Sequence, residues 1–165
     1  MSRLNKIEIK YIIIQIIAFN FIILAFRTFS YLTDVHLSYL FLSSIKNSED
    51  TTSLLLLLRE NNGMQILDLI NSVKSYQIFG FILGCLISIR ISSKLKISRL
   101  NSLIIIILSF LIFFIKYFLT FYTLMDFVSL FNKFETYLYF RGCLFLAVSL
   151  LLFYLSYRVK INTKI

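Results

Sequence analysis

The 165-residue sequence contains no proline and no tryptophan, and it holds two cysteines and one histidine. Proline commonly kinks membrane helices where transporters use broken segments. Its absence therefore favours straight helices and argues against a transporter with discontinuous spans. The cysteines, Cys85 and Cys143, are expected at depths that differ by about 15 Å, which is beyond disulfide reach. We interpret both as small apolar side chains.

Motifs for catalysis, metal binding and ion coupling are also missing. The single histidine, His36, has no set of cysteine or acidic residues at metal-ligand spacing beside it. No GxSxG motif, P-loop or TVGYG-like filter occurs. Proton-coupled transporters usually need an acid deep in a span, and no Asp or Glu lies there. We expect a protein that is not an enzyme and has no cofactor or metal ion.

Apolar residues dominate what is present. They form 59% of the chain, and the mean hydropathy is +0.85, whereas soluble domains are usually about 45–50% apolar. A membrane-spanning helix needs about 20 apolar residues. The sequence therefore predicts an all-α integral membrane protein with a single membrane domain over residues 1–165. The four predicted spans cover about residues 11–31, 75–92, 102–124 and 137–157.

The distribution of charge orients these spans. The net charge of +9 would suggest a nucleic-acid partner in a soluble protein, but cytoplasmic loops of membrane proteins also accumulate Lys and Arg. Basic residues gather before the first span, between the second and third, and after the fourth, while most acids lie in the other two loops. We therefore expect both termini in the cytoplasm, a first span that is an uncleaved signal anchor, and no nucleic-acid partner. The basic residues that carry this argument are Arg3, Lys6, Lys10, Arg90, Lys94, Lys96, Arg99, Arg158, Lys160 and Lys164.

The first external loop, residues 32–74, contains apolar segments that are too short to cross a bilayer. Asp34 is placed to cap a helix that continues through Ser44. A second segment covers 49–60, after which Asn61-Asn62-Gly63 is typical of a helix stop. A third segment, 64–72, either stands alone or continues into the second span. These pieces predict short amphipathic helices at the membrane interface or over the end of the bundle.

Four basic residues share one predicted depth. Lys10 and Arg27, Arg99 and Lys116, and Arg141 and Arg158 are each 17 residues apart, and Lys74 precedes Arg90 by 16. At helical rise this spacing places the four about 25 Å above the cytoplasmic face. They are Arg27, Lys74, Lys116 and Arg141.

Three interpretations of this shared depth stay open. The spans are short and the basic side chains snorkel to the interface; or acids such as Asp34, Asp126 and Glu135 pair with them; or they bind an anion. Asn20, Arg27 and Asp34 recur at seven-residue spacing, which predicts one polar face on the first span. The candidates for anion or partner binding are Arg27, Lys116, Arg141, Lys74 and Asn20. On the third span, Ser109, Lys116, Thr120 and Thr123 form a similar series.

Small residues indicate where helices approach closely. Gly80, Gly84 and Ser88 recur every four residues on the second span, a pattern that allows close packing of another helix. Gly142 and Ser149 on the fourth span offer a possible partner surface. The partner helix lies either inside the bundle or in a different membrane protein.

The segments Leu24-Ala25-Phe26-Arg27-Thr28-Phe29 and Tyr139-Phe140-Arg141, with a last span that closes on Tyr154 to Tyr157, resemble a flavobacterial family. This is the small membrane protein associated with the exosortase F system, in which an Arg ends the first span and another opens the last. The paired arginines and prolines of that family's last span are absent. The layout is also similar to that of immunity proteins against pore-forming colicins, which implies docking against an incoming toxin in the inner membrane.

These observations lead to a hypothesis of a non-enzymatic accessory protein in a bacterial inner membrane. Its partners would be the lipid bilayer and another membrane protein, met through helix–helix contact. One version is a bacteriocin immunity protein that neutralises a pore-forming toxin. The alternative from another class is a carrier or lipid-handling protein that uses the cationic residues.

Overall fold

The computed structural model describes residues 5–46, 63–97, 99–116 and 127–161, and every long element among them is an α-helix. The elements are α1 (Asn5–Ser30), α2 (Val35–Lys46), α4 (Gly63–Lys94), α5 (Arg99–Lys116), the short 3-10 helix η2 (Val128–Leu130) and α7 (Phe134–Ile161). The expected all-α class is therefore confirmed for these residues.

Three of the helices are long and apolar enough to cross a membrane. The apolar stretches lie in α1 at Ile9–Ser30, in α4 at Gly63–Lys94 and in α7 at Phe134–Arg158. The corresponding stretch of α5, Asn101–Ile112, is shorter, and the rest of the expected third span, residues 117–124, lies outside the described residues. The chain is thus a multi-pass membrane protein by the length and composition of its helices.

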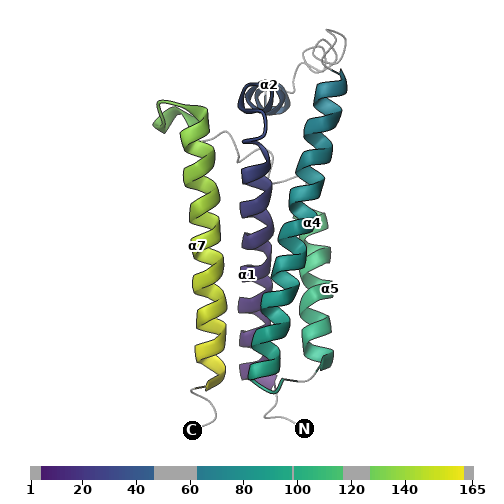
Figure 1. Ribbon diagram of the computed structural model, residues 1–165. Coiled ribbons are helices and arrows are strands. Elements are labelled where there is room, and N and C mark those ends of the chain that lie inside the picture. The colour runs from purple at the N-terminus through teal and green to yellow at the C-terminus, as the bar shows by residue number, and fades with distance from the viewer. Residues whose placement is uncertain (1–4, 47–62, 98, 117–126, 162–165) are drawn as a thin grey trace.

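Helix α1 forms the centre of the bundle. It packs against α7 on one side and against α4 and α5 on the other, while α4 and α7 barely touch (Figure 1). Because α1 has neighbours on several sides, its side chains Ala18, Phe19 and Ile22 are fully buried. Figure 1 also shows that α1 begins and α7 ends at the same end of the bundle.

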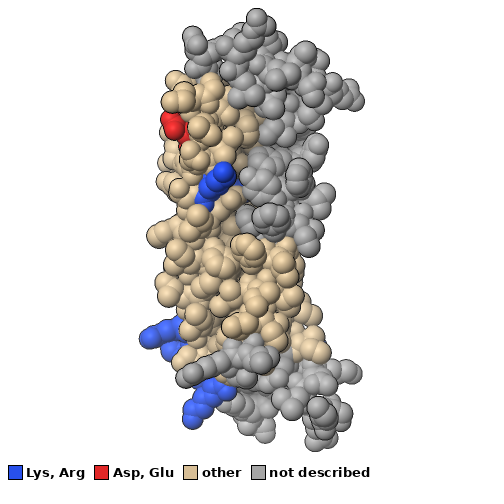
Figure 2. Space-filling model, turned by 90° about the vertical axis from the view of Figure 1, so that its right-hand side faces the viewer, with Lys and Arg blue, Asp and Glu red and all other residues tan. Residues whose placement is uncertain are grey.

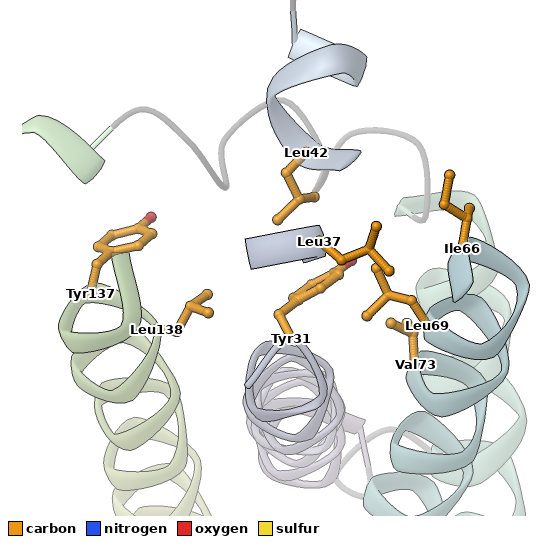
Figure 3. Packing of buried hydrophobic residues seen from close by; sticks show 8 residues of the cluster. All are labelled: Tyr31, Leu37, Leu42, Ile66, Leu69, Val73, Tyr137 and Leu138. Carbon is orange, nitrogen blue, oxygen red and sulfur yellow. The ribbon is translucent and has the colours of Figure 1, made fainter. Parts of the chain in front are cut away.

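Helix α2 caps the opposite end of the bundle. Its start follows from Asp34, whose Oδ1 accepts a hydrogen bond from the Leu37 backbone N–H at 2.9 Å, so the expected cap is confirmed. From this position Leu37 and Leu42 reach down to Tyr31 at the end of α1 (Figure 3). Ile66, Leu69 and Val73 of α4 and Tyr137 and Leu138 of α7 complete this cluster.

The segment 64–72 belongs to α4, which runs without interruption from Gly63 to Lys94. The stop expected at Asn61-Asn62-Gly63 concerns the end of the segment 49–60, which lies outside the described residues together with the asparagines, so it stays a prediction. Gly63 itself is the first residue of α4. The physical reason is that Ile66, Leu69 and Val73 share one face and are buried against the cap cluster. That burial favours continuing the helix to Gly63.

The other end of α4 stops at a tight turn. Lys96 has a φ of 52°, in the left-handed region. The Ile97 backbone N–H donates to Ser92 O at 3.0 Å, and the Lys96 N–H donates to Ser93 O at 3.2 Å. These two bonds form a Schellman motif, which reverses the chain toward α5.

The charged surface is divided along the length of the bundle. Figure 2 shows the face that carries α4 and α5, with a broad uncharged band between its two ends. Basic side chains lie near the end where α1 begins, and a basic and an acidic patch lie nearer the capped end. An uncharged band of this kind matches the hydrocarbon core of a bilayer.

Candidate functional site

Four basic residues share one predicted depth, and the three whose side chains are described occupy different environments. Arg27 lies in the last turn of α1 and is only 1% exposed. Lys74 is exposed on α4, and Arg141 is half-buried on α7. The Lys116 side chain lies outside the described residues. A cation in the last helical turn is favoured by the partial negative charge of the helix C-terminus, which helps to explain the position of Arg27.

The expected polar face on the first span is wrong in one respect. Helix α1 ends at Ser30, so Asp34 is not on it and instead caps α2. Asn20 lies on α1, but its Nδ2 donates to the Ile16 carbonyl one turn earlier at 2.9 Å. Its amide is therefore turned back onto its own helix. On α5, Ser109 is fully buried, and the later members of its expected series, Lys116, Thr120 and Thr123, have no described side chains.

Gly80, Gly84 and Ser88 lie on the face of α4 that packs against α1. A Cβ added at Gly80 would lie 3.2 Å from the Ile23 Cα, and one added at Gly84 would lie 3.1 Å from the Phe19 ring. Gly142 of α7 also faces α1, where an added Cβ would lie 2.7 Å from Phe29 Cδ1. Both glycine surfaces thus receive aromatic side chains of α1, and the possible pairing of α7 with the α4 ridge does not occur.

A buried polar network crosses the bundle and was not singled out from the sequence. Gln15 of α1 is fully buried and connects three helices. Its Nε2 donates to Ser156 Oγ of α7 at 3.0 Å, and its Oε1 accepts from Ser88 Oγ of α4 at 2.7 Å. In an apolar medium such bonds hold helices in register, because an unpaired amide there is costly.

Two further hydrogen bonds join α1 to α4 and to α7. Tyr11 OH and Ser92 Oγ are 3.1 Å apart, and Ser149 Oγ donates to the Ala18 carbonyl at 2.7 Å. The sequence carried a signal: Ser88 and Ser92 are four residues apart, and Ser149 and Ser156 are seven apart. Each pair therefore lies on one helix face.

Arg141 borders a pocket of about 450 Å³ at the capped end of α7. Its Nη1 donates to Tyr137 OH at 2.5 Å, and its Cζ lies 5.1 Å from the centre of the Phe145 ring. The pocket lining consists of Phe127, Leu130, Phe131, Tyr137, Phe140, Arg141, Leu144 and Phe145. The site combines one guanidinium with aromatic and aliphatic walls.

The residues of redox and metal chemistry lie apart from one another. Cys85 and Cys143 are free thiols, which confirms that they form no disulfide. His36 is exposed on α2. Within the described ranges no group of three or more His, Cys, Asp or Glu side chains is placed to hold a metal ion.

Comparisons with known proteins add no relative: the chain matches no protein-family model, no curated protein and no solved structure.

Proposed function

We propose that the chain crosses a bacterial inner membrane four times, with both termini in the cytoplasm. The apolar start of α5 and the apolar sequence that follows it support a crossing by this segment, in addition to those of α1, α4 and α7. The start of α1, the α4–α5 connection and the end of α7 lie at one end of the bundle (Figure 1), and all three regions are rich in Lys and Arg. The excess of basic residues at this end favours the cytoplasmic side.

Within that membrane, the protein acts as a non-enzymatic accessory subunit that binds another membrane protein. The supporting observation is an apolar surface on the part of α4 that extends beyond the bilayer. Helix α4 has 32 residues and is about 48 Å long, whereas a hydrocarbon core is about 30 Å thick. If Lys94 marks the cytoplasmic boundary, the core ends near Lys74, and the first turns of α4 stand outside it.

Exposed apolar side chains in those first turns are unlike those on the rest of the bundle. Met64 is 77% exposed and Leu67 is 52% exposed, and Tyr39 of α2 is exposed at the same end. Lipid tails cover such side chains inside the core, but here water would meet them. Exposed apolar surface of this kind commonly marks a contact with another protein.

Affinity purification of the tagged chain in a mild detergent tests this proposal. We expect a membrane protein to co-purify with the wild type and to be largely lost from the double variant Met64→Asn, Leu67→Asn. The control is Gln65→Asn, an exposed polar position in the same turn. Absence of any membrane protein with the wild type, or equal loss from both variants, would contradict the proposal.

One version of this function is bacteriocin immunity, in which the partner is an incoming pore-forming toxin. The layout supports this form, because α2 and the first turns of α4 present a surface at the end where such a toxin would arrive. Cells that express the chain should then survive a cognate pore-forming bacteriocin. Survival should be lost in the Met64→Asn, Leu67→Asn variant and kept in Gln65→Asn.

A further inference from the structure

The pocket beside Arg141 has a composition that suits one class of ligand. It forms where the segment 127–131 folds back along the outer turns of α7. Phe131 holds this segment in place, with its ring 5.4 Å from that of Tyr137 and 5.3 Å from that of Phe140. The volume of about 450 Å³ lies within the range of small-molecule sites.

The pocket has almost wholly apolar walls, and the Arg141 side chain lies at its border. In the lining that the structure describes, Arg141 is the charged residue and the others are Phe, Leu and Tyr. Tyr137 and Phe145 flank the guanidinium and set its position at the wall. A ligand that matches this surface carries one anionic group attached to an apolar chain.

The depth of Arg141 matches the head-group region of one leaflet. If Arg158 marks the cytoplasmic boundary, a core about 30 Å thick covers 20 residues of α7 and ends near Leu138. Arg141 then lies about 5 Å inside this boundary, from which an arginine side chain reaches the phosphate level by snorkelling. Phe140 and Leu144 are exposed on the outside of α7, so the pocket opens toward lipid.

We propose that this pocket binds one acidic phospholipid, with its phosphate at the Arg141 guanidinium and an acyl chain along the Phe140, Leu144 and Phe145 side. A free phosphate ion suits the site poorly, because it would exchange its hydration for apolar walls and one cation. A phospholipid brings its own apolar chain and is already concentrated in the leaflet. The proposal needs no protein partner and goes beyond the accessory function.

The chain offers a matched internal control at the other end of α7. Arg158 lies four residues after Tyr154, as Arg141 lies four residues after Tyr137. Its Nε donates to Tyr154 OH at 2.8 Å, and its Cζ lies 5.5 Å from the centre of that ring. Both pairs are Arg–Tyr contacts near a membrane boundary, but Arg158 does not line this pocket.

The absence of tryptophan makes the test direct, because Phe140→Trp introduces a unique fluorescent reporter at the pocket. The full-length variant is reconstituted in two kinds of phosphatidylcholine vesicle. One contains added phosphatidylglycerol with brominated acyl chains, and the other contains added phosphatidylcholine with brominated acyl chains. We expect brominated phosphatidylglycerol to quench with about fivefold higher apparent affinity, the size expected of one basic contact with an acidic lipid. Adding Arg141→Gln should remove this preference, and adding Arg158→Gln should leave it unchanged.

Three results would overturn the proposal. Equal quenching by both lipids would show that the pocket has no preference for an acidic lipid. Equal loss with Arg141→Gln and Arg158→Gln would mean that surface charge alone attracts the lipid. Relief of quenching by millimolar inorganic phosphate, with sodium chloride at matched ionic strength as the control, would assign the site to the free anion. Because purified chain is used, failure here is distinguishable from failure of partner binding.

Discussion

At the scale of single residues, the polar side chains of α1 divide into two kinds. Gln15 bonds to two neighbouring helices, whereas Asn20 bonds to its own backbone. Both are amides within the same apolar run, and the sequence pattern predicted a role in binding for Asn20 alone. Only the first kind connects the helices, which leads to a direct comparison of stability.

Replacing Gln15 with leucine is expected to lower the free energy of unfolding by about 1 kcal/mol, because two interhelical hydrogen bonds of about 0.6 kcal/mol each are lost. Asn20→Leu should change it by less than about 0.5 kcal/mol, since no bond between helices is removed. Chemical unfolding in mixed micelles measures both. A double-mutant cycle between Gln15→Leu and Ser88→Ala should show coupling, and additive effects would contradict the network.

Gly80 has a backbone neighbour that cannot move aside. A Cβ there would lie 3.2 Å from the Ile23 Cα, so Gly80→Leu should force α1 and α4 apart. Overpacking of this kind costs about 1–3 kcal/mol. The thermal midpoint in a mild detergent should fall, whereas Ile78→Leu, at a nearby exposed position, should leave it nearly unchanged. Equal midpoints for the two variants would contradict the close approach.

At the scale of elements, capping decides where two of the helices begin or end. Asp34 starts α2, and removing its carboxylate by Asp34→Ala should cost about 1 kcal/mol of helix stability. Amide hydrogen exchange in α2 should then rise by about fivefold, because 1 kcal/mol corresponds to that ratio. Asp34→Asn, which keeps an oxygen acceptor, should exchange almost as the wild type does. Unchanged exchange in Asp34→Ala would show that the Leu37 and Leu42 contacts alone hold α2.

Lys96 ends α4 in a conformation that favours glycine. A side chain in the left-handed region costs about 1–2 kcal/mol, and glycine removes this cost. Glycine also makes the unfolded chain more flexible, which offsets part of the gain. Lys96→Gly should therefore stabilise the protein by about 0.5–1 kcal/mol in the same unfolding measurement. Lys94→Gly, inside the last helical turn, should instead destabilise by about 1 kcal/mol. A loss of stability in both variants would argue against the Schellman turn.

At the scale of the whole molecule, the length of α4 separates an aqueous part from a membrane part. In a chain with Cys85→Ala and Cys143→Ala, a cysteine in place of Met64 should react with a membrane-impermeant maleimide added to intact spheroplasts. A cysteine in place of Phe79, which is also exposed in the structure but lies within the expected core, should stay unmodified. Labelling of the Met64 position only after permeabilisation would reverse the proposed orientation.

Much of the architecture could be predicted from the sequence, because apolar run length and charge report directly on the bilayer. The positions of α1, α4 and α7 follow from runs that only a membrane can accommodate. The Asp34 cap also follows from local chemistry. Whether the segment 64–72 joins α4 stayed open in the sequence, because the answer depends on Ile66 and Leu69 being buried against α2 and α7.

The candidate site depended more strongly on tertiary structure. Sequence spacing placed Arg27, Lys74 and Arg141 at one depth, but depth along a helix leaves the rotation and neighbours of each residue undetermined. The fold buries Arg27, exposes Lys74 and sets Arg141 at an aromatic pocket.

By itself, the sequence thus determined that the chain belongs in a membrane, since the water–lipid boundary acts on each helix separately. Tertiary structure decided that α1 is the central helix, that Gln15 connects its neighbours and that Arg141 faces a pocket. These features depend on which helix faces meet, and helical periodicity alone leaves that choice open in an apolar solvent, where lipid covers any face equally well.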